Sequence, residues 1–331
     1  MFFARGCVGI DVGTDTIKAA HLIESRGKWA VKGLYKIKNP LMRTTFSETG
    51  DKEILTKCLQ EIKKAFSCNK CVMGVDGHRV VFRNLQFPRL HMKELKEAVY
   101  WEAREFSTMF NGDFVYDFEL LEQQSDNCRV LIAGADREYI MDYIKIARNA
   151  GLNLSVLDVY PLAAARLLSQ KEKNSVVAVI DMGSSHTEIT VVEKGRAFLN
   201  RTVDFGGSNL VEIVAKLLSM DKLKAEQVII DPGPYREKIQ EKVMAALQEL
   251  MIEISRFFDF YSIQNKGKQI NYAVLAGNGG KLWCWSRAFA DYFNIQLVSA
   301  NNMGFQLKSL DNSGNIDYME YFNAIGFALR G

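Results

Sequence analysis

The chain has 331 residues, 48% of them hydrophobic and 24% charged, which is the composition of a globular protein long enough for two domains. Its formal net charge of +3 is too small to indicate binding to nucleic acid or to a membrane surface. No apolar run approaches the roughly 18–20 residues that span a bilayer, and the first residues lack the basic and apolar regions of a signal peptide. We therefore expect a cytoplasmic protein.

An internal repeat is the strongest feature of the chain. Residues 8–16 (VGIDVGTDT) and residues 177–185 (VAVIDMGSS) each read as a buried strand that ends in a tight glycine turn. A returning strand follows in both copies, at 17–23 and at 186–192, and then a second turn and a third strand. Two copies of one unit predict a duplicated architecture with two related lobes.

Hydrophobic periodicity predicts the elements between the two copies. Asp76-Gly77 reads as a turn between two strands, and the chain after Pro88 reads as a compact α/β insert whose last helix is capped by Asp136 and stopped by Gly151. In chain order we expect a helix at 51–66, strands at 72–75 and 80–87, a helix at 92–106, strands at 114–121 and 129–133, and a helix at 136–150.

The second half of the chain contains longer helices. Gly206-Gly207 precedes the first of them, and Pro232 and Pro234 mark a boundary before the second. A buried strand then ends in the glycine-rich turn 277–280. The predicted elements are a helix at 209–218, a helix at 235–264, a strand at 271–276 and a final helix at 318–330.

The repeated turn has the chemistry of a phosphate and magnesium site. The first strand delivers Asp11 to the turn, where its carboxylate would hold Mg²⁺ through water. Gly13 lets the backbone approach a phosphate, and the amides of Thr14, Asp15 and Thr16 would point at its oxygens. Lys18, on the returning strand, would neutralise phosphate charge. The equivalent residues of the second copy are Asp181, Gly183, Ser184, Ser185 and His186.

Two matched loops are a stronger signal than one. A single Asp-x-Gly turn is usually only a hairpin turn, whereas a pair with matched flanks suits a triphosphate gripped from both sides. The other phosphate motifs fail, because Gly280-Lys281 is not part of a Walker A loop and no ribose-binding acid follows the 277–280 turn at the spacing of a Rossmann fingerprint. We therefore predict a nucleotide between the lobes.

These motifs resemble the superfamily of actin, the heat-shock chaperone ATPases and the sugar kinases. More narrowly, the chain resembles the PilM family of the type IV pilus machinery, which is related to the division protein FtsA. The matching segments are short, but they follow one another in order along nearly the whole chain: 11–19, 99–103, 130–135, 150–157, 181–189, 203–209, 254–261 and 324–331.

The resemblance implies an α/β, actin-like ATPase fold with two RNase H-like lobes, each with an inserted subdomain. Lobe 1 (subdomain 1A) would comprise 1–79 and 152–173, with an FtsA-like insert (1C) at 80–151 that binds a partner. Lobe 2 (2A) would comprise 174–220 and 271–331, with its terminal helix packing toward lobe 1, and 221–270 would form subdomain 2B.

The resemblance also implies the cofactors ATP and Mg²⁺ and further site residues. Gly206 and Gly207 would close on the phosphates from the second lobe. Gly277, Asn278 and Gly279 would lie against the adenosine. Arg256 is a weaker candidate for the base or ribose, and an ordinary solvated helix charge is the equal alternative.

The chain departs from the catalytic members of the superfamily at one position. Tyr160 stands where the heat-shock chaperones have an acid before their Pro-x-Ala-Ala segment, and tyrosine is a poor general base near neutral pH. Asp158 is the fallback catalytic residue, because on a strand end it would face the same side. We expect slow or absent hydrolysis. His186 is a second departure, which would either donate to phosphate or fill the turn.

Membrane attachment is expected to depend on a partner. The final helix reads as core-packed, and neither end offers the basic amphipathic anchor that FtsA-like proteins carry, so we expect no direct membrane insertion. The family resemblance implies binding of the N-terminal cytoplasmic peptide of a PilN-like inner-membrane protein, in a groove of the insert. The insert is rich in aromatic residues, most of which we expect in its core: Phe87, Tyr100, Trp101, Phe106, Phe110 and Phe114.

The predicted function is therefore a scaffold of the type IV pilus inner-membrane platform, with ATP as a structural ligand or switch. Contacts with pilus motor ATPases and self-association stay open. The alternatives are a small-molecule kinase of the same superfamily, a self-polymerising ATPase like actin or FtsA, and a nucleotide-free scaffold as in type II secretion relatives.

Overall fold

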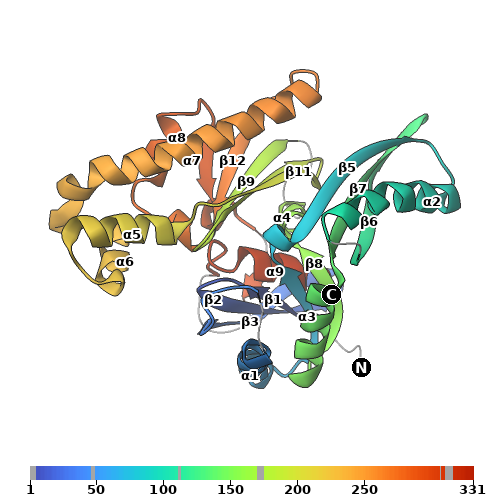
Figure 1. The fold of residues 1–331 in the computed structure, drawn as a ribbon, viewed down its shortest axis with the longest axis horizontal. Coiled ribbons are helices and arrows are strands. Elements are labelled where there is room, and N and C mark those ends of the chain that lie inside the picture. Colours follow the sequence, from blue (N-terminus) through green and yellow to red (C-terminus); the bar gives the residue numbers. More distant parts are fainter. Residues whose placement is uncertain (1–4, 46–48, 111–112, 170–174, 306, 310–315) are drawn as a thin grey trace.

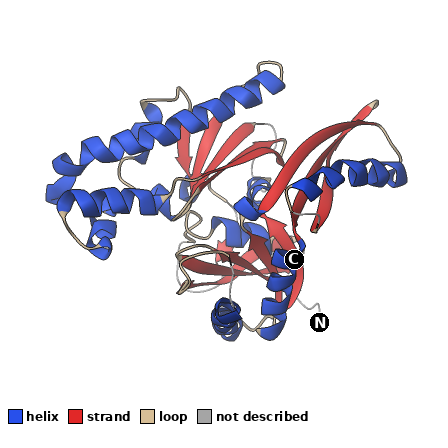
Figure 2. Ribbon diagram, in the orientation of Figure 1, coloured by secondary structure: helices blue, strands red, loops and turns tan. Residues whose placement is uncertain are grey.

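A computed structural model describes residues 5–45, 49–110, 113–169, 175–305, 307–309 and 316–331. Three sheets organise this part of the chain, two of them central and one at the side (Figures 1 and 2). The predicted boundary at 173 and 174 lies outside the described residues, and the division into four subdomains stays a prediction. Among the described residues, no helix combines the length and the apolar character needed to cross a membrane.

Apart from β14 at the edge of the first, the two central sheets have the same strand order and direction. The first runs β14-β3-β2-β1-β4-β8, and the second runs β11-β10-β9-β12-β13. In each, a three-stranded meander is extended by parallel strands: β4 pairs with β1 and β12 pairs with β9. This common plan agrees with the duplication read from the repeat. The strand bounds are β1 Arg5–Val12, β2 Thr16–Ser25, β3 Lys28–Lys38, β4 Lys70–Val75, β8 Asn153–Val159, β9 Val176–Met182, β10 Thr187–Glu193, β11 Arg196–Val203, β12 Tyr272–Ala276, β13 Gln296–Ser299 and β14 Lys308–Ser309.

The third sheet belongs to the predicted insert. Its order is β5-β7-β6, and helix α2 packs on it over a core that includes Leu95, Val99, Phe106 and Ile132. Strands β4 and β5 do not pair with each other, because the Asp76-Gly77 turn carries the chain from the first sheet into this one. The bounds are β5 Val80–Pro88, α2 Met92–Ala103, β6 Phe114–Gln123 and β7 Asn127–Asp136.

The remaining helices cover the central sheets. Helix α1 (Thr49–Ala65) contacts α3 (Arg137–Asn149), so α3 shares its core with the first sheet although the chain reaches it from the insert. The second sheet carries α5 (Gly207–Leu218), α6 (Lys222–Ile230), α7 (Arg236–Gln264) and α8 (Trp285–Ala290), with the long α7 across the top of Figure 1. Short 3-10 turns are η1 Gly77–Arg79, η2 Arg104–Thr108, η3 Gly233–Tyr235, η4 Asn278–Lys281 and η5 Ala300–Asn302.

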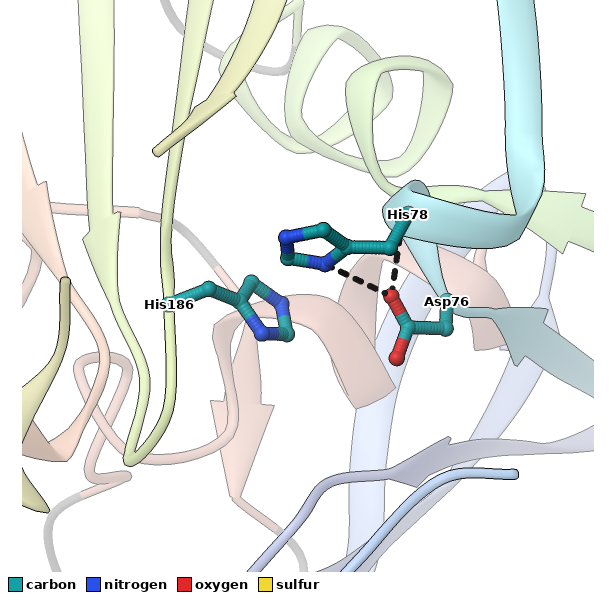
Figure 3. A group of neighbouring side chains, drawn as sticks. All are labelled: Asp76, His78 and His186. Atoms are coloured by element: carbon teal, nitrogen blue, oxygen red, sulfur yellow. Dashed lines mark hydrogen bonds and ion pairs between the residues drawn. The ribbon is translucent and has the colours of Figure 1, made fainter. Parts of the chain in front are cut away.

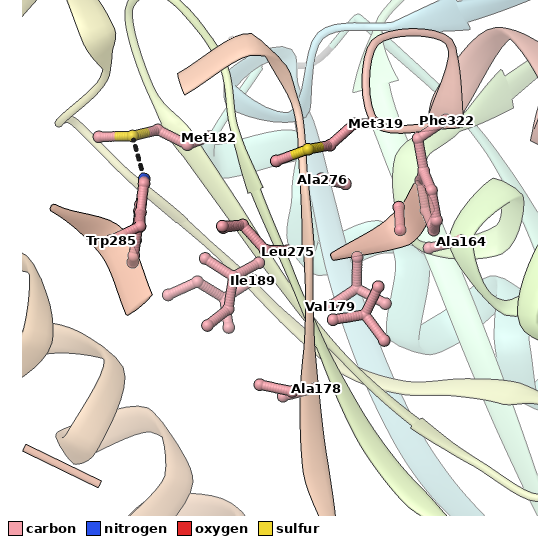
Figure 4. Packing of buried hydrophobic residues seen from close by; sticks show 14 of the residues in the cluster. Ala164, Ala178, Val179, Met182, Ile189, Leu275, Ala276, Trp285, Met319 and Phe322 are labelled. Carbon is pink, nitrogen blue, oxygen red and sulfur yellow. Dashed lines mark hydrogen bonds between the residues drawn. The ribbon is translucent and has the colours of Figure 1, made fainter. Parts of the chain in front are cut away.

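Two helices at the centre are exchanged between the lobes. Helix α4 (Tyr160–Leu168) follows the first sheet but contacts β10 and β11 of the second, whereas α9 (Phe322–Ala328) follows the second sheet and packs on β1, β2 and β4 of the first. Figure 4 shows residues of both contributing to one apolar core, with Ala164 of α4 and Phe322 of α9 near Val179 of β9. The two helices cross closely, since a Cβ on Gly326 would lie 2.6 Å from the carbonyl oxygen of Ala163. The lobes therefore meet through a packed joint.

Candidate functional site

The two repeated loops have the same local geometry. The amide of Gly13 donates to the carbonyl of Thr16 over 3.1 Å, and the amide of Gly183 donates to the carbonyl of His186 over 2.9 Å. Each loop joins the first two strands of its lobe. The loops also touch, because the hydroxyls of Thr14 and Ser185 share a hydrogen bond of 2.8 Å. The first loop therefore faces the second across the boundary between the lobes.

A cleft of about 430 Å³ lies along these loops. Most of the predicted site residues line it: Asp11, Gly13, Thr14, Asp15, Thr16, Lys18, Asp181, Gly183, Ser184, His186, Gly207, Gly277, Asn278 and Gly279. Ser185 and Gly206 do not line the cleft, but they contact residues that do. A Cβ on Gly206 would lie 2.4 Å from the carbonyl oxygen of Ser184, and the amide of Gly207 donates to the carbonyl oxygen of Gly183, so the start of α5 is joined to the second loop.

Two carboxylates occupy equivalent places at the ends of β1 and β9. Asp11 accepts a 2.9 Å hydrogen bond from the hydroxyl of Tyr160, and Lys18 lies 4.0 Å away. Asp181 accepts a 2.6 Å hydrogen bond from the side-chain amide of Asn323. Burial raises the pKa of Asp181 to about 6, against the lowering effect of that hydrogen bond. A bound cation would remove this cost of holding two carboxylates in one cleft.

Lysines face these carboxylates. Lys18 lies directly across the β2–β3 ladder from Lys36, an arrangement that like charges disfavour unless an anion or acid lies between them. Glu320 satisfies part of this charge, since it pairs with Lys36 at 2.8 Å and with Lys281 at 3.2 Å. Lys38 also lines the cleft. The cleft thus combines two carboxylates with a lysine-rich wall.

The glycine-rich turn after β12 packs on the second loop. Gly277 has a φ of +80°, and a Cβ there would lie 2.3 Å from Asp181 Oδ1. A Cβ on Gly279 would overlap the side chain of Met182, while Trp285 donates to the Gly279 carbonyl over 2.9 Å. Close contacts within the protein are therefore enough to explain why both positions are glycine, without any contact to a ligand.

Two predicted residues lie outside the cleft. Arg256 is paired with Glu253 at 2.7 Å, and its side chain is 68% exposed on α7, which agrees with the solvated-charge alternative. Asp158 is buried in ion pairs with Arg166 at 3.0 Å and Arg330 at 3.3 Å. It does not line the cleft that Tyr160 lines, because the chain turns into α4 between the two residues, and its catalytic role stays a prediction.

Tyr160 is held as a neutral hydrogen-bond donor. Burial, followed by the charge of Asp11, raises its pKa well above the ordinary tyrosine value. A phenol that keeps its proton cannot accept one from water, and its hydroxyl is already committed to Asp11. Tyr160 therefore orients the Asp11 carboxylate.

Sequence reasoning missed an acid and an apolar wall. Glu188 lines the cleft directly across the ladder from Asp181, at the position that Lys18 takes across from Asp11. Burial raises its pKa to about 7. Superposing the two repeats in sequence would have found it, since both residues stand seven positions after their aspartate. Helix α6, which the sequence pattern did not predict, adds apolar wall residues together with α5 and the turn: Val211, Leu223, Ile229, Ile230 and Leu282.

The sequence profile described as type IV pilus assembly protein PilM matches residues 9–331. The chain belongs to this family. Among solved structures it is similar to a PilM–PilN type IV pilus biogenesis complex, with a TM-score of 0.84, 24% identity and 98% of each chain covered. It is also similar to the ethanolamine utilization protein EutJ from Carboxydothermus hydrogenoformans, with a TM-score of 0.61, 15% identity and coverage of 99% of this chain and 90% of that one. These likenesses confirm the predicted actin-like ATPase fold.

A curated relative is similar to this chain over a shorter stretch. The cell division protein FtsA of Bacillus subtilis (strain 168) is 31% identical over 99 residues, which are 30% of this chain. The alignment spans 22% of that protein, so it carries the resemblance noted in the sequence but not the activity or partners of the whole relative.

Proposed function

We propose that this member of the PilM family is a scaffold of the type IV pilus inner-membrane platform that holds Mg·ATP between its lobes as a structural ligand or switch. The main support for nucleotide binding is the pair of equivalent loops. They meet across one cleft and are joined by the Thr14–Ser185 hydrogen bond. A ligand that contacts both loops stabilises one arrangement of the lobes.

The residues present fit Mg²⁺ and a triphosphate. Asp11 and Asp181 supply the oxygen ligands that Mg²⁺ prefers, through water. The loop residues 13–16 and 183–186, with Gly207 and Lys18, form the phosphate walls. The adenosine end belongs between the 277–279 turn and α6, where apolar side chains suit a planar base. ATP is the proposed occupant because its triphosphate would use both phosphate walls and its adenine the apolar end.

We expect this ATP to be hydrolysed slowly or not at all. The position of the expected acid is taken by Tyr160, whose hydroxyl donates to Asp11, and Asp158 is committed to Arg166 and Arg330. Glu188 favours a second candidate function, an active ATPase or kinase, because a pKa of about 7 is matched to general-base work. The two candidates differ in whether bound ATP stays intact.

The insert is the proposed partner surface. PilN is the partner named for the solved relative, and we propose that a PilN-like membrane protein binds here through its N-terminal cytoplasmic peptide and so places the protein at the inner membrane. Phe106 fills the core of the insert, whereas Trp101 is 62% and Tyr100 47% exposed on α2. Their rings contact each other, and Arg104 lies over the Trp101 ring. Exposed tryptophan and tyrosine are typical anchors of binding surfaces.

A peptide-capture experiment tests this function. N-terminal cytoplasmic peptides of PilN-like proteins and of unrelated single-pass membrane proteins are immobilised, and the full-length protein is applied with and without Mg·ATP. We expect retention by the PilN-like peptide alone and a nucleotide-dependent change in affinity. Equal retention by all peptides, or none by the PilN-like peptide in either condition, would contradict the proposal.

A further inference from the structure

Two histidines and an aspartate meet beside the cleft, which His186 lines and the other two do not, and the proposed nucleotide site gives Asp76 and His78 no role. Asp76 and His78 lie at the turn that leads from β4 into the insert, and His186 lies in the second loop, with their side chains pointing toward one another (Figure 3). Each offers one potential ligand atom, and these atoms all lie within 4.8 Å of one another. In the described part of the chain, this is the one group of three or more His, Cys, Asp or Glu side chains with such spacing.

The spacing suits a small coordination sphere. Asp76 Oδ1 lies 3.3 Å from His78 Nδ1, and two ligands of a tetrahedral Zn²⁺ ion at its usual bond lengths lie roughly 3.3 Å apart. The rings of His78 and His186 are nearly perpendicular, with centroids 4.7 Å apart. Rotation of the His186 ring toward Asp76 would bring the three ligand atoms around one ion, and water would supply the fourth ligand.

A second layer of hydrogen bonds orients each ligand. The Nε2 of His78 lies 2.6 Å from Asp204 Oδ1, so a carboxylate holds the ring with Nδ1 turned to Asp76. The Nδ1 of His186 lies 3.0 Å from the Ser185 hydroxyl, which leaves its Nε2 free for a metal. The hydroxyl of Thr44 donates to the other oxygen of Asp76. Metal-bound histidines in proteins are typically held by a carboxylate on the opposite nitrogen, as His78 is.

The charge states also favour a cation. Although burial raises the pKa of Asp76, hydrogen bonds from the Thr44 hydroxyl and the His78 amide lower it, and the pKa lies below the ordinary value, so this residue is a carboxylate. Burial lowers the pKa of His186, so its imidazole is neutral, as a ligand must be. A proton on His78 would compete with the metal. Burial lowers the pKa of His78, but its contacts with Asp204 and Asp76 outweigh burial and raise the pKa above the ordinary value.

We propose that Asp76, His78 and His186 form a site for a divalent transition metal of the Zn²⁺ class. Two imidazoles and one carboxylate are the ligand set of such ions, whereas Mg²⁺ prefers oxygen ligands, so this site is distinct from the one at Asp11 and Asp181. It rests on the side-chain geometry and not on the proposed function.

A metal here would tie the lobes together. Asp76 and His78 follow a strand of the first sheet, while His186 and Asp204 belong to loops of the second. Binding therefore favours the arrangement of the lobes in which the two loops meet. Any ligand that favours the same arrangement must bind more tightly when the metal is present, since such coupling is reciprocal.

Cobalt spectroscopy tests the site. Co²⁺ is titrated into the nucleotide-free, full-length protein at mildly alkaline pH while visible absorption is recorded, and Zn²⁺ is then added as competitor. We expect one equivalent of Co²⁺ with the intense bands of a four-coordinate ion, displaced by Zn²⁺. His78→Gln and His186→Asn should remove these bands, and Asp204→Asn should lower the affinity by about 10- to 100-fold.

Two controls make the result decisive. His91→Gln removes an exposed histidine outside the group and should leave the titration unchanged. Asp204 is 90% exposed, so its substitution tests the site without disturbing a buried residue. Absence of bands in the wild-type protein would overturn the proposal, as would bands that persist in both histidine variants. A thiolate-to-cobalt charge-transfer band would also overturn it, because the metal would then lie on cysteine.

Discussion

At the scale of single residues, Asp11 carries the largest share of the proposed nucleotide site. It stands at the end of a buried strand, and the Tyr160 hydroxyl fixes its carboxylate within the cleft. Asp11→Ala should lower the affinity for Mg·ATP by roughly 10-fold or more, since residues that orient the waters of a bound ion typically matter to that extent. Titration calorimetry measures this. Arg256→Ala, outside the cleft, is the control and should bind like the wild type; equal affinities for all three proteins would count against the site.

We expect the stability of the fold to depend on pH through Glu188. Burial raises its pKa from 4.5 to about 7, and its Oε2 has no hydrogen-bond partner among the described residues. Between these values the folded state keeps a proton that the unfolded chain has lost, so this residue's contribution to stability falls as pH rises and is lowest above about 7. Glu188→Gln should therefore stabilise the fold by about 1–3 kcal/mol near pH 8 and have little effect near pH 4.

Urea denaturation at the two pH values checks the Glu188 prediction. Gln keeps an acceptor for the Thr202 hydroxyl, which now donates to Glu188 over 2.8 Å, so the substitution changes charge more than packing. Glu249→Gln on the exposed side of α7 is the control. The same effect of Glu188→Gln at both pH values would mean that the buried charge is not its cause.

The sequence predicted which residues line the cleft where the two repeats have matching positions. It did not do so where the direction of a side chain depends on how the chain folds. Asp11 and Asp181 follow from matched positions in two loops, and both line the cleft. Asp158 and Tyr160 are two apart in sequence, but one ends a strand and the other begins a helix, so they point to different places. The cluster of Asp76, His78 and His186 could not be predicted, because His186 is more than a hundred residues from His78 in the sequence.

At the scale of elements, helix α2 presents the most exposed aromatic surface of the insert. Trp101→Ala should weaken binding of the PilN-like peptide by about 10-fold or more, because a desolvated tryptophan is a typical hot spot. Fluorescence anisotropy of a labelled peptide measures this. Phe260→Ala, which truncates a 48% exposed ring on α7, is the matched control. Loss of binding in the α7 variant but not in the α2 variant would place the partner elsewhere.

The crossing of α4 and α9 tests the joint between the lobes. A methyl group at Gly326 would lie 2.6 Å from the Ala163 carbonyl oxygen, so Gly326→Ala should destabilise the protein by about 1–3 kcal/mol through overpacking. Gly50, in the first turn of α1, has nothing within 4 Å of its added methyl, and Gly50→Ala should be neutral or stabilising by up to about 1 kcal/mol. Thermal unfolding compares the two. A neutral Gly326→Ala would show that the joint is loosely packed.

Helices with strong hydrophobic periodicity could be predicted from the sequence. The sheet against which each helix packs could not. The long helix at 235–264 is observed at Arg236–Gln264, and the cap at Asp136 accepts the Tyr139 amide as expected. The final helix is shorter than predicted, at Phe322–Ala328, because the chain before it forms a turn. Pattern alone cannot show that α4 and α9 exchange lobes, since both read simply as buried helices.

At the scale of the whole molecule, we propose that two related lobes close on one ligand without consuming it. The exchanged helices join the lobes, and the paired loops meet across the cleft. The same closure would bring His186 to Asp76 and His78 and would transmit the state of the cleft to the insert, which begins at that turn. A population shift between lobe arrangements needs no turnover of ATP.

The most direct test is to identify the nucleotide that the protein retains. The full-length protein is incubated with Mg·ATP, separated from free nucleotide by gel filtration, denatured, and its nucleotide quantified by chromatography, with Asp11→Ala as background. We predict close to one molecule of intact ATP per wild-type chain and far less in the variant. Retention of ADP with release of phosphate would contradict the structural role of ATP in favour of Glu188-dependent hydrolysis, and no retained nucleotide in the wild type would contradict the nucleotide site itself.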